Sequence, residues 1–458
     1  MMSGRRQKSN ALALLLIGTF SMTEVNIIGW LGISELVMFL VAPVLFMVDY
    51  AKLRHDGFLP LIWLSLLMMA SSVMSNVMNH NYFFVAMKGI AAVYSIFAIT
   101  IVLHHLLRND PIELRWLLLG IAISVILSTF IFQRGCERVS GGEVLSNDAA
   151  TEAVMSYSLY WANLLRRWVE LPIDFSYLSL PSGLTAAIVA FIALFALFNA
   201  GGRSAFAVSV FACALVLIGG RESSRMKLIK KHILVMGVLF VLLGAAIGKT
   251  YKILAKSGAL GERQYEKYMN QTKAGEGMLN LLMAGRADFF ACLIAAKDRP
   301  IIGYGAWPID VNDYWGHFLN KYGAPEDFAF HEESLRNNPT RVRRLPGHSQ
   351  ILTGWTWHGI GGLVFWLYVA YLYGTVLKNH LAAIPHMYGY FCLALPTCMW
   401  ALLFSPFGNR ISVVSLIVMC VFAKQVGLGR FSFVHKDVVI GKMRGNFPRG
   451  SSRLGRAF

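Results

Sequence analysis

Charged residues are scarce in this chain, and their scarcity excludes an ordinary water-soluble domain. Only 15% of the 458 residues are Asp, Glu, Lys or Arg, whereas soluble domains average about 25%. Hydrophobic residues make up 56%, and they fall into blocks of roughly 17 to 25 residues, the length that crosses a bilayer as a helix. Runs such as ILVMGVLFVLLGAAIG do not alternate with polar residues, which excludes a membrane β-barrel. We therefore expect an all-α polytopic membrane protein.

Cysteines are also few, and the six present form no disulfide framework. Four of them lie within apolar runs, where cysteine behaves as a small hydrophobic residue: Cys213, Cys392, Cys398 and Cys420. Cys136 and Cys292 are expected in loops, and we do not expect them to pair. An A-x-A-like cleavage site is missing after MMSGRRQKSN, so we expect an uncleaved first helix.

Eleven apolar segments are candidate membrane spans. They are Ala11–Trp30, Leu31–Val48, Phe58–Met78, Phe83–Leu107, Trp116–Phe132, Gly183–Phe198, Ser204–Ile218, Ile233–Gly248, Ile351–Leu377, Met387–Phe404 and Ser412–Phe422. Basic loops orient such helices, because cytoplasmic loops are rich in Lys and Arg. The basic N-terminus, the basic loops and the basic C-terminal tail all become cytoplasmic only if one more crossing exists.

The best candidate for the additional crossing is Ala153–Leu171, which is polar enough to need shelter from neighbouring helices. We therefore expect twelve helices with both termini cytoplasmic. The alternative is an interfacial helix at this position and an exception to the charge rule elsewhere. The favoured topology gives four regions: N-terminal membrane helices in 1–248, a large periplasmic catalytic loop in 249–350, C-terminal membrane helices in 351–427, and a basic cytoplasmic tail in 428–458. Because the excess of positive charge lies in short loops and this tail, we do not expect nucleic acid as a partner.

This topology gathers cationic side chains at the outer face. Arg203, Arg286, Arg341, Arg343, Arg344 and Arg410 map there, and Lys88 lies near enough to the outer end of its helix to extend toward that face. A single arginine in a loop is more often structural. The outer face lacks the pull of anionic cytoplasmic lipid, so repeated arginines indicate a strongly anionic ligand. Guanidinium suits phosphate through paired, charge-assisted hydrogen bonds.

His348 directly precedes an apolar helix and is the best-placed general base, because imidazole titrates near neutrality. We expect no metal site. The neighbouring His331, Glu332 and Glu333 point in different directions on any helix, and they are more typical of a solvated loop. Asp310 and Asp313 are expected to be solvated in the same way.

Three segments resemble the O-antigen ligase and Wzy-type polysaccharide polymerase family. They are GGRSAFAVSVFACALVL, matched at Arg203 and Ser204; GRADFFACLIAAKDRPIIGYG, matched at Arg286, Pro300, Gly303 and Gly305; and HSQILTGWTWHGIGGLVFWL, matched at His348, Leu352, Gly359 and Gly362. The chain departs from the family pattern at Phe290, where Trp is usual, and at Ser349, where Asn is frequent. The resemblance covers about a third of the chain.

The resemblance implies a twelve-helix bundle similar to GT-C glycosyltransferases, in the bacterial inner membrane with its active site facing the periplasm. It implies metal-independent, inverting glycosyl transfer from an undecaprenyl-diphosphate-linked glycan, without a cofactor. In that scheme His348 and Arg286 are catalytic, and Gly303 and Gly305 form the motif turn. The diphosphate is bound by Arg203, Arg286, Arg341, Arg344, Arg410 and Lys88.

The favoured function is a polymerase that joins lipid-linked repeat units into an exported polysaccharide, either O-antigen or exopolysaccharide. The alternative in the same class is a ligase that transfers the glycan to lipid A-core or protein. The alternative from another class is a transporter of polysaccharide or lipid-linked sugar, which would favour repeated halves and polar groups at the midplane. Expected partners are the lipid-linked glycan, a glycan or lipid A-core acceptor, membrane lipids, and the flippase and chain-length regulator of the same pathway.

Overall fold

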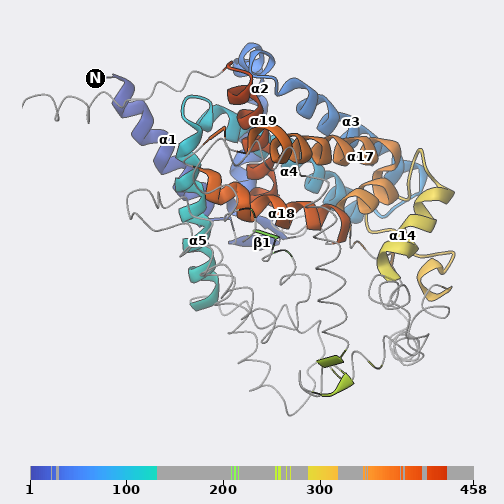
Figure 1. The fold of residues 1–458 in the computed structure, drawn as a ribbon. Coiled ribbons are helices and arrows are strands. Elements are labelled where there is room, and N and C mark those ends of the chain that lie inside the picture. Colours follow the sequence, from blue (N-terminus) through green and yellow to red (C-terminus); the bar gives the residue numbers. More distant parts are fainter. Residues whose placement is uncertain are drawn as a thin grey trace, which may run out of the picture.

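The computed structural model (Figure 1) describes helices at both ends of the chain and a short segment between them. The described residues are 2–21, 23–26, 30–130, 208, 211, 212, 215, 253, 254, 256–258, 265, 269, 287–317, 344, 345, 347, 349–381, 383, 384, 387–404 and 410–430. The helices of the N-terminal part are α1 (Met2–Thr19), α2 (Ile33–His55), α3 (Leu59–Met78), α4 (Phe83–Leu107), the short η1 (Pro111–Glu113) and α5 (Leu114–Phe130). Those of the C-terminal part are α14 (Ala287–Asp298), α17 (Gln350–Thr375), the π-helical η2 (Val376–His380), α18 (Tyr388–Phe404) and α19 (Arg410–Gly427).

Five helices in the described part of the chain are long and apolar enough to cross a membrane: α2, α3, α4, α17 with η2, and α19. Two shorter apolar helices, Ser9–Thr19 and Tyr388–Phe404, accompany them. α2 and α3 expose large apolar side chains, including Leu40 at 79% and Trp63 at 53%, as lipid-facing helices do. The prediction of a helical membrane protein is therefore confirmed. The additional span predicted at Ala153–Leu171 and most of the predicted spans next to it lie outside the described residues.

α4 and α19 form the centre of the bundle. Most of each helix is buried, and α4 packs against α2, α3 and α19. Small residues allow close crossings elsewhere, as is common between membrane helices. At the α1–α5 crossing, a Cβ added to Gly18 would lie 2.3 Å from the carbonyl oxygen of Leu117. A Cβ added to Gly120 would lie equally close to that of Leu15, so both glycines are needed for this contact.

α2, α4 and α19 run in the same direction. Their first turns meet where Glu35 of α2 binds Arg410 of α19, and the same end of the bundle holds Lys88 of α4. Their last turns meet where His104 of α4 stacks on Phe422 of α19. We call the two ends of the bundle the Lys88 end and the Asp49 end.

α17 also begins at the Lys88 end and finishes at the Asp49 end, where His380 of η2 closely approaches Gly427. α5 runs back toward the Lys88 end, because it follows the last turn of α4. The four spans predicted between Phe130 and Gln350 lie almost entirely outside the described residues. α1 begins at the Asp49 end, where Asn10 donates to the carbonyl of Leu106, so the start of α1 and the end of α19 lie at the same end of the bundle.

The first predicted span is wrong in its second half. We expected helix from Ala11 to Trp30, but α1 ends at Thr19 and an antiparallel pair of strands follows, β1 (Glu24–Asn26) and β2 (Trp30–Gly32). Ser, Thr, Glu and Asn interrupt the apolar run here, and β-branched and aromatic residues favour strands. The second span is longer than predicted, since α2 continues past Val48 to His55. α3, α4, α5, α17 and α18 begin and end within a few residues of the predicted spans, and α19 continues past Phe422 to Gly427.

Candidate cationic site and its counterpart

Three of the predicted cationic residues lie together at the Lys88 end. Lys88 is in the second turn of α4, Arg344 lies just before α17, and Arg410 is the first residue of α19. The charges of Arg344 and Arg410 both act on the Lys88 ammonium. These three residues are therefore close enough for their charges to interact.

Lys88 is held against the loop that follows α14. Its Nζ lies 4.5 Å from the centroid of the Trp307 ring, a cation–π contact. The next residue, Gly89, allows this approach, because a Cβ there would lie 2.2 Å from that of Ala306. Trp307 adopts a positive φ of 46°, a conformation that costs a non-glycine residue roughly 1–3 kcal/mol. Its ring also lies 4.7 Å from that of Trp357, so this strained tryptophan joins α4 to α17.

Arg410 is fixed by an acidic residue that sequence reasoning missed. Its Nε and Nη2 donate to the two carboxylate oxygens of Glu35, each at 2.7 Å. Glu35 is only 5% exposed in its side chain and also accepts the backbone N–H of Gly32 at 3.2 Å, which is the glutamate half of a capping box. The ion pair orients the guanidinium and offsets part of its charge. The only sequence signal was a glutamate three residues after a glycine at the beginning of an apolar helix.

The glycine turn of the second resembling segment is present and docks on the third. Gly303 and Gly305 have φ of 77° and 83°. α17 is broken at Gly359, which has a non-helical backbone. Tyr304 N–H donates to the carbonyl of Thr356 at 2.7 Å, and Gly305 N–H donates to that of Trp357 at 3.0 Å.

This contact explains the break in α17. Backbone groups freed by a break inside a membrane helix must find partners in the protein, and the turn supplies them. Across the break, Ile360 N–H donates to the carbonyl of Ile301 at 3.0 Å. A Cβ at position 359 would lie 1.9 Å from that same oxygen. Glycine is therefore required at 359, and the two resembling segments form one structural unit.

Three asparagines at the end of α3 also hold the turn, and sequence reasoning missed all of them. Asn76 Oδ1 accepts the N–H of Ala306 at 3.0 Å. Asn79 and Asn81 donate to the carbonyls of Gly303 and Tyr304 at 3.1 and 3.3 Å. The available signal was the polar sequence SNVMNHN at the end of an apolar helix. These bonds place the turn firmly over α3.

The segment after the turn is more ordered than predicted. We expected Asp310 to be solvated, but it is 7% exposed, and its two carboxylate oxygens accept the backbone N–H groups of Tyr314 and Trp315, both at 2.9 Å. The correction has a simple cause, since a carboxylate that caps a turn gains hydrogen bonds that replace water. Tyr314 in turn bonds to Asp298 and to the hydroxyl of Tyr304. Burial, reinforced by that bond to Tyr314, raises the pKa of the Tyr304 hydroxyl.

The other predicted site residues, His348, Arg286, Arg203 and Arg341, lie outside the described residues, as does Arg343. The residues that follow Arg343 and His348 in the sequence are described. Arg344 is exposed and pairs with Ile309 in an isolated antiparallel bridge. Ser349 caps α17, where its Oγ accepts Leu352 N–H at 3.2 Å and donates to the carbonyl of Leu402 at 2.9 Å.

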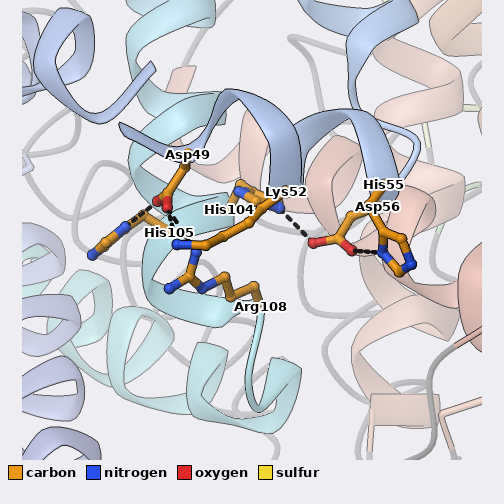
Figure 2. Close-up of polar contacts among 7 residues, drawn as sticks. All are labelled: Asp49, Lys52, His55, Asp56, His104, His105 and Arg108. Atoms are coloured by element: carbon orange, nitrogen blue, oxygen red, sulfur yellow. Dashed lines mark hydrogen bonds and ion pairs between the residues drawn. The ribbon is translucent and has the colours of Figure 1, made fainter. Parts of the chain in front are cut away.

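The Asp49 end carries a second charged cluster, shown in Figure 2. Asp49 of α2 is 1% exposed and accepts from Lys52 at 2.6 Å, from Arg108 at 2.8 Å, and from His105. Sequence reasoning used the basic loops only to orient the helices, and it missed the carboxylate that Lys52 and Arg108 contact here. Because His105 lies in the last turn of α4 and Arg108 directly follows that helix, this carboxylate joins the C-terminal ends of α2 and α4.

Asp56 forms the other half of this cluster. It accepts from His104 Nε2 at 2.8 Å and from His55 Nδ1 at 2.9 Å. His104 is fully buried, and its ring packs against Phe58 and Phe422, which also contact each other. Burial by itself would raise the pKa of Asp56, but the hydrogen bonds from His104 and His55 outweigh it and hold the pKa below the ordinary 3.8. Within the described residues, no group of three or more His, Cys, Asp or Glu is arranged to hold a metal ion.

The fold and the site define a helical membrane protein with a cationic site at one end of the bundle and a compensated charge cluster at the other. No protein-family model matches the chain, and no curated protein matches it.

Proposed function

We propose that the protein is a polymerase-type glycosyltransferase, which joins undecaprenyl-diphosphate-linked repeat units into an exported polysaccharide. The observation that supports this most strongly is the convergence of Lys88, Arg344 and Arg410 at one end of the bundle. Like charges held close together at the edge of a low-dielectric region repel one another. In the described part of the site, Glu35 offsets only one of the three. A bound diphosphate would relieve the remaining repulsion.

The same chemistry gives the arginines a role in the reaction. When the anomeric carbon leaves its phosphate oxygen, negative charge grows on the diphosphate, and fixed cations stabilise that charge in the transition state. Arginine offers a planar pair of donors to phosphate, whereas Lys88 supplies a compact charge. The new bond forms between the acceptor oxygen and the anomeric carbon from the opposite face, which inverts its configuration. His348 takes the acceptor's proton.

The glycine turn supports this proposal through rigidity. Catalytic groups are most effective when helices and well-packed turns hold them in position. The turn at 301–305 is bonded to α3 and to the break in α17, and Trp307 next to it contacts Lys88. Broken membrane helices also occur in transporters, where free carbonyls bind ions. In α17 the Thr356 and Trp357 carbonyls accept from the turn, an arrangement that favours the enzyme over the transporter.

Deletion of the gene in its source bacterium tests the proposal against the ligase alternative. A lost polymerase leaves single repeat units on the lipid carrier, because monomers are no longer joined. A lost ligase leaves long lipid-linked chains, because polymerisation continues without transfer to the acceptor. If neither species accumulates, the protein does not act on a lipid-linked glycan and the proposal is refuted.

A transfer assay with the purified protein and lipid-linked donor tests the chemistry. We expect activity to be unaffected by a metal chelator. Arg286→Ala should abolish transfer, and Arg286→Lys should restore it only in part, because an ammonium lacks the planar pair of donors. Full activity of the alanine variant at normal expression would make Arg286 an ordinary loop arginine.

The proposal also requires the Lys88 end to face the periplasm. Tyr82, at that end, is 80% exposed, and Leu428, at the Asp49 end, is 54% exposed. A membrane-impermeant thiol reagent added to the periplasmic side should label Tyr82→Cys and spare Leu428→Cys. The reverse pattern would place the cationic site on the wrong side of the membrane for an exported product.

A further inference from the structure

The first turns of α17 bury polar atoms that have no partner. Gln350 is 2% exposed. Among the described residues, neither its Nε2 nor its Oε1 has a hydrogen-bond partner. The hydroxyl of Thr353 is also buried without one. Residues three apart lie on the same face of a helix, so these atoms form one group.

Such a group needs an explanation. A buried polar group without a partner destabilises the fold, and native proteins leave few of them. Other polar side chains nearby are paired: Ser349 donates to the carbonyl of Leu402 at 2.9 Å and Thr356 to that of Cys292 at 3.3 Å. In the first two turns of α17 the unpartnered atoms belong to Gln350 and Thr353, and further along the helix the Nδ1 of His358 is also buried without a partner among the described residues.

Contacts link this group to the cationic site. A Cβ added to Gly347 would lie 3.6 Å from the Thr353 hydroxyl and 3.8 Å from the Trp357 ring. The ring of Trp357 lies 4.7 Å from that of Trp307. The Trp307 ring is in turn in cation–π contact with the Lys88 ammonium. The polar group, the two indoles and the cation thus follow one another along the same end of the bundle.

The donors and acceptors of this group select a class of ligand. An amide and a hydroxyl each both donate and accept hydrogen bonds. Phosphate needs donors and a cation needs acceptors, whereas the hydroxyls of a sugar need both. Trp357 adds an apolar ring beside them. We propose that Gln350 and Thr353 bind the hydroxyl groups of a sugar ring that packs against Trp357, next to the diphosphate site. This inference rests on the proposed function and assigns the saccharide part of the substrate.

The test uses the full-length protein in detergent and two conservative variants, Gln350→Met and Thr353→Val. Each removes a buried unpaired group while nearly keeping its volume, so both should unfold at the same temperature as the parent or higher. Gln425→Met is the matched control, since Gln425 is also buried, at 4% exposure, and its Oε1 also lacks a partner within the described part of the chain, but it lies at the Asp49 end. The probe is the repeat-unit oligosaccharide released from the donor lipid by mild acid.

We expect the oligosaccharide to raise the unfolding temperature of the parent and of Gln425→Met, because a ligand stabilises the folded state that binds it. It should not do so for Gln350→Met or Thr353→Val, and their transfer rate should fall by at least about tenfold, as for the loss of one or two hydrogen bonds. Thr353→Ser keeps a hydroxyl and should retain most of the transfer.

Two outcomes separate this inference from the proposed function. If the parent transfers glycan and Gln350→Met and Thr353→Val do so equally well, the sugar site is refuted and the proposed function stands. If the parent transfers nothing from any lipid-linked donor, but the oligosaccharide stabilises it only when Gln350 and Thr353 are present, the proposed reaction is refuted and the sugar site stands.

Discussion

The two ends of the helical bundle use charge in opposite ways. At the Asp49 end, two carboxylates are each surrounded by basic groups, and Asp49 alone contacts Lys52, His105 and Arg108. At the Lys88 end, three cations converge, and in the part of the chain that the structure describes a single carboxylate, Glu35, offsets one of them. At the first end Asp49 and Asp56 are each paired with basic groups, whereas at the second end Arg410 pairs with Glu35 and Lys88 and Arg344 have no carboxylate partner among the described residues.

This difference indicates the role of each end of the bundle. Compensated ion pairs that join two helices serve to fix the helices relative to each other. An excess of one charge, kept beside a strained tryptophan, lowers stability unless a ligand balances it. Proteins keep such locally unfavourable features mainly at functional sites. Substitutions at the Asp49 end should therefore change stability, and substitutions at the Lys88 end should change transfer.

The largest expected effect is at His348. As the general base, His348→Gln should lower turnover by about 10² to 10⁴ in a protein that still folds and binds donor. The matched variant at the other end, His104→Gln, loses a buried imidazole that packs against Phe58 and Phe422. It should lower the unfolding temperature and leave turnover per folded molecule unchanged. Normal turnover of His348→Gln would make that histidine structural.

Substitutions of Arg410 test whether one residue both stabilises the fold and binds the substrate. Arg410→Gln leaves the Glu35 carboxylate buried without its partner and should reduce the free energy of unfolding by about 3–5 kcal/mol. The double variant Glu35→Gln with Arg410→Gln removes both charges and should recover much of that stability. Transfer should remain low in the double variant if the guanidinium also binds diphosphate. Recovery of transfer together with stability would show that Arg410 only holds the fold.

At the Asp49 end, Asp49→Asn should reduce the free energy of unfolding by about 1.5–3 kcal/mol, the contribution of a hydrogen bond to a charged group. Lys52→Met is the control within the same cluster. Its side chain is 49% exposed, and exposed ion pairs contribute less than about 1 kcal/mol. Chemical denaturation followed by fluorescence measures both. Loss of transfer by Asp49→Asn without loss of stability would contradict the structural role of this end.

The smallest expected effect is the acid dependence of Asp56. Its pKa in the folded protein is below its ordinary value, so folding favours the charged carboxylate. The stability it contributes is fully present above the unfolded-state pKa of about 3.9 and is lost as pH falls through the lower folded-state pKa. Unfolding temperatures of the parent should therefore decline more steeply below about pH 4 than those of Asp56→Asn. Identical acid profiles would mean that Asp56 gains nothing from its two histidines.

The sequence predicts the helices well because each of them carries its own signal. The apolar run of α4 was predicted from Phe83 to Leu107, and the helix has those bounds. The prediction failed for Phe20 to Trp30, where hydropathy alone favoured a helix and local residue preferences favoured two strands. Gly303 and Gly305 were also identified from the chain, because a turn with positive φ has a direct signature in glycine.

The partners of these residues had no such signature. Glu35 and Arg410 are separated by 375 positions in the chain, and Asn76 contacts Ala306 across 230. The residues around Asn76 and Glu35 do not indicate which distant segment of the chain each side chain will contact. The clamp around Asp49 was missed for the same reason, although its basic partners had been noticed as topology signals.

Composition, apolar run length and the distribution of Lys and Arg thus determine by themselves that this is a helical membrane protein, because those properties act locally and add along the chain. Only the tertiary structure decides that Lys88, Arg344 and Arg410 share one end, that the 301–305 turn fills the break at Gly359, and that Gln350 and Thr353 are buried without partners. These facts depend on which helices pack together. Packing is a property of surfaces brought together from distant parts of the sequence.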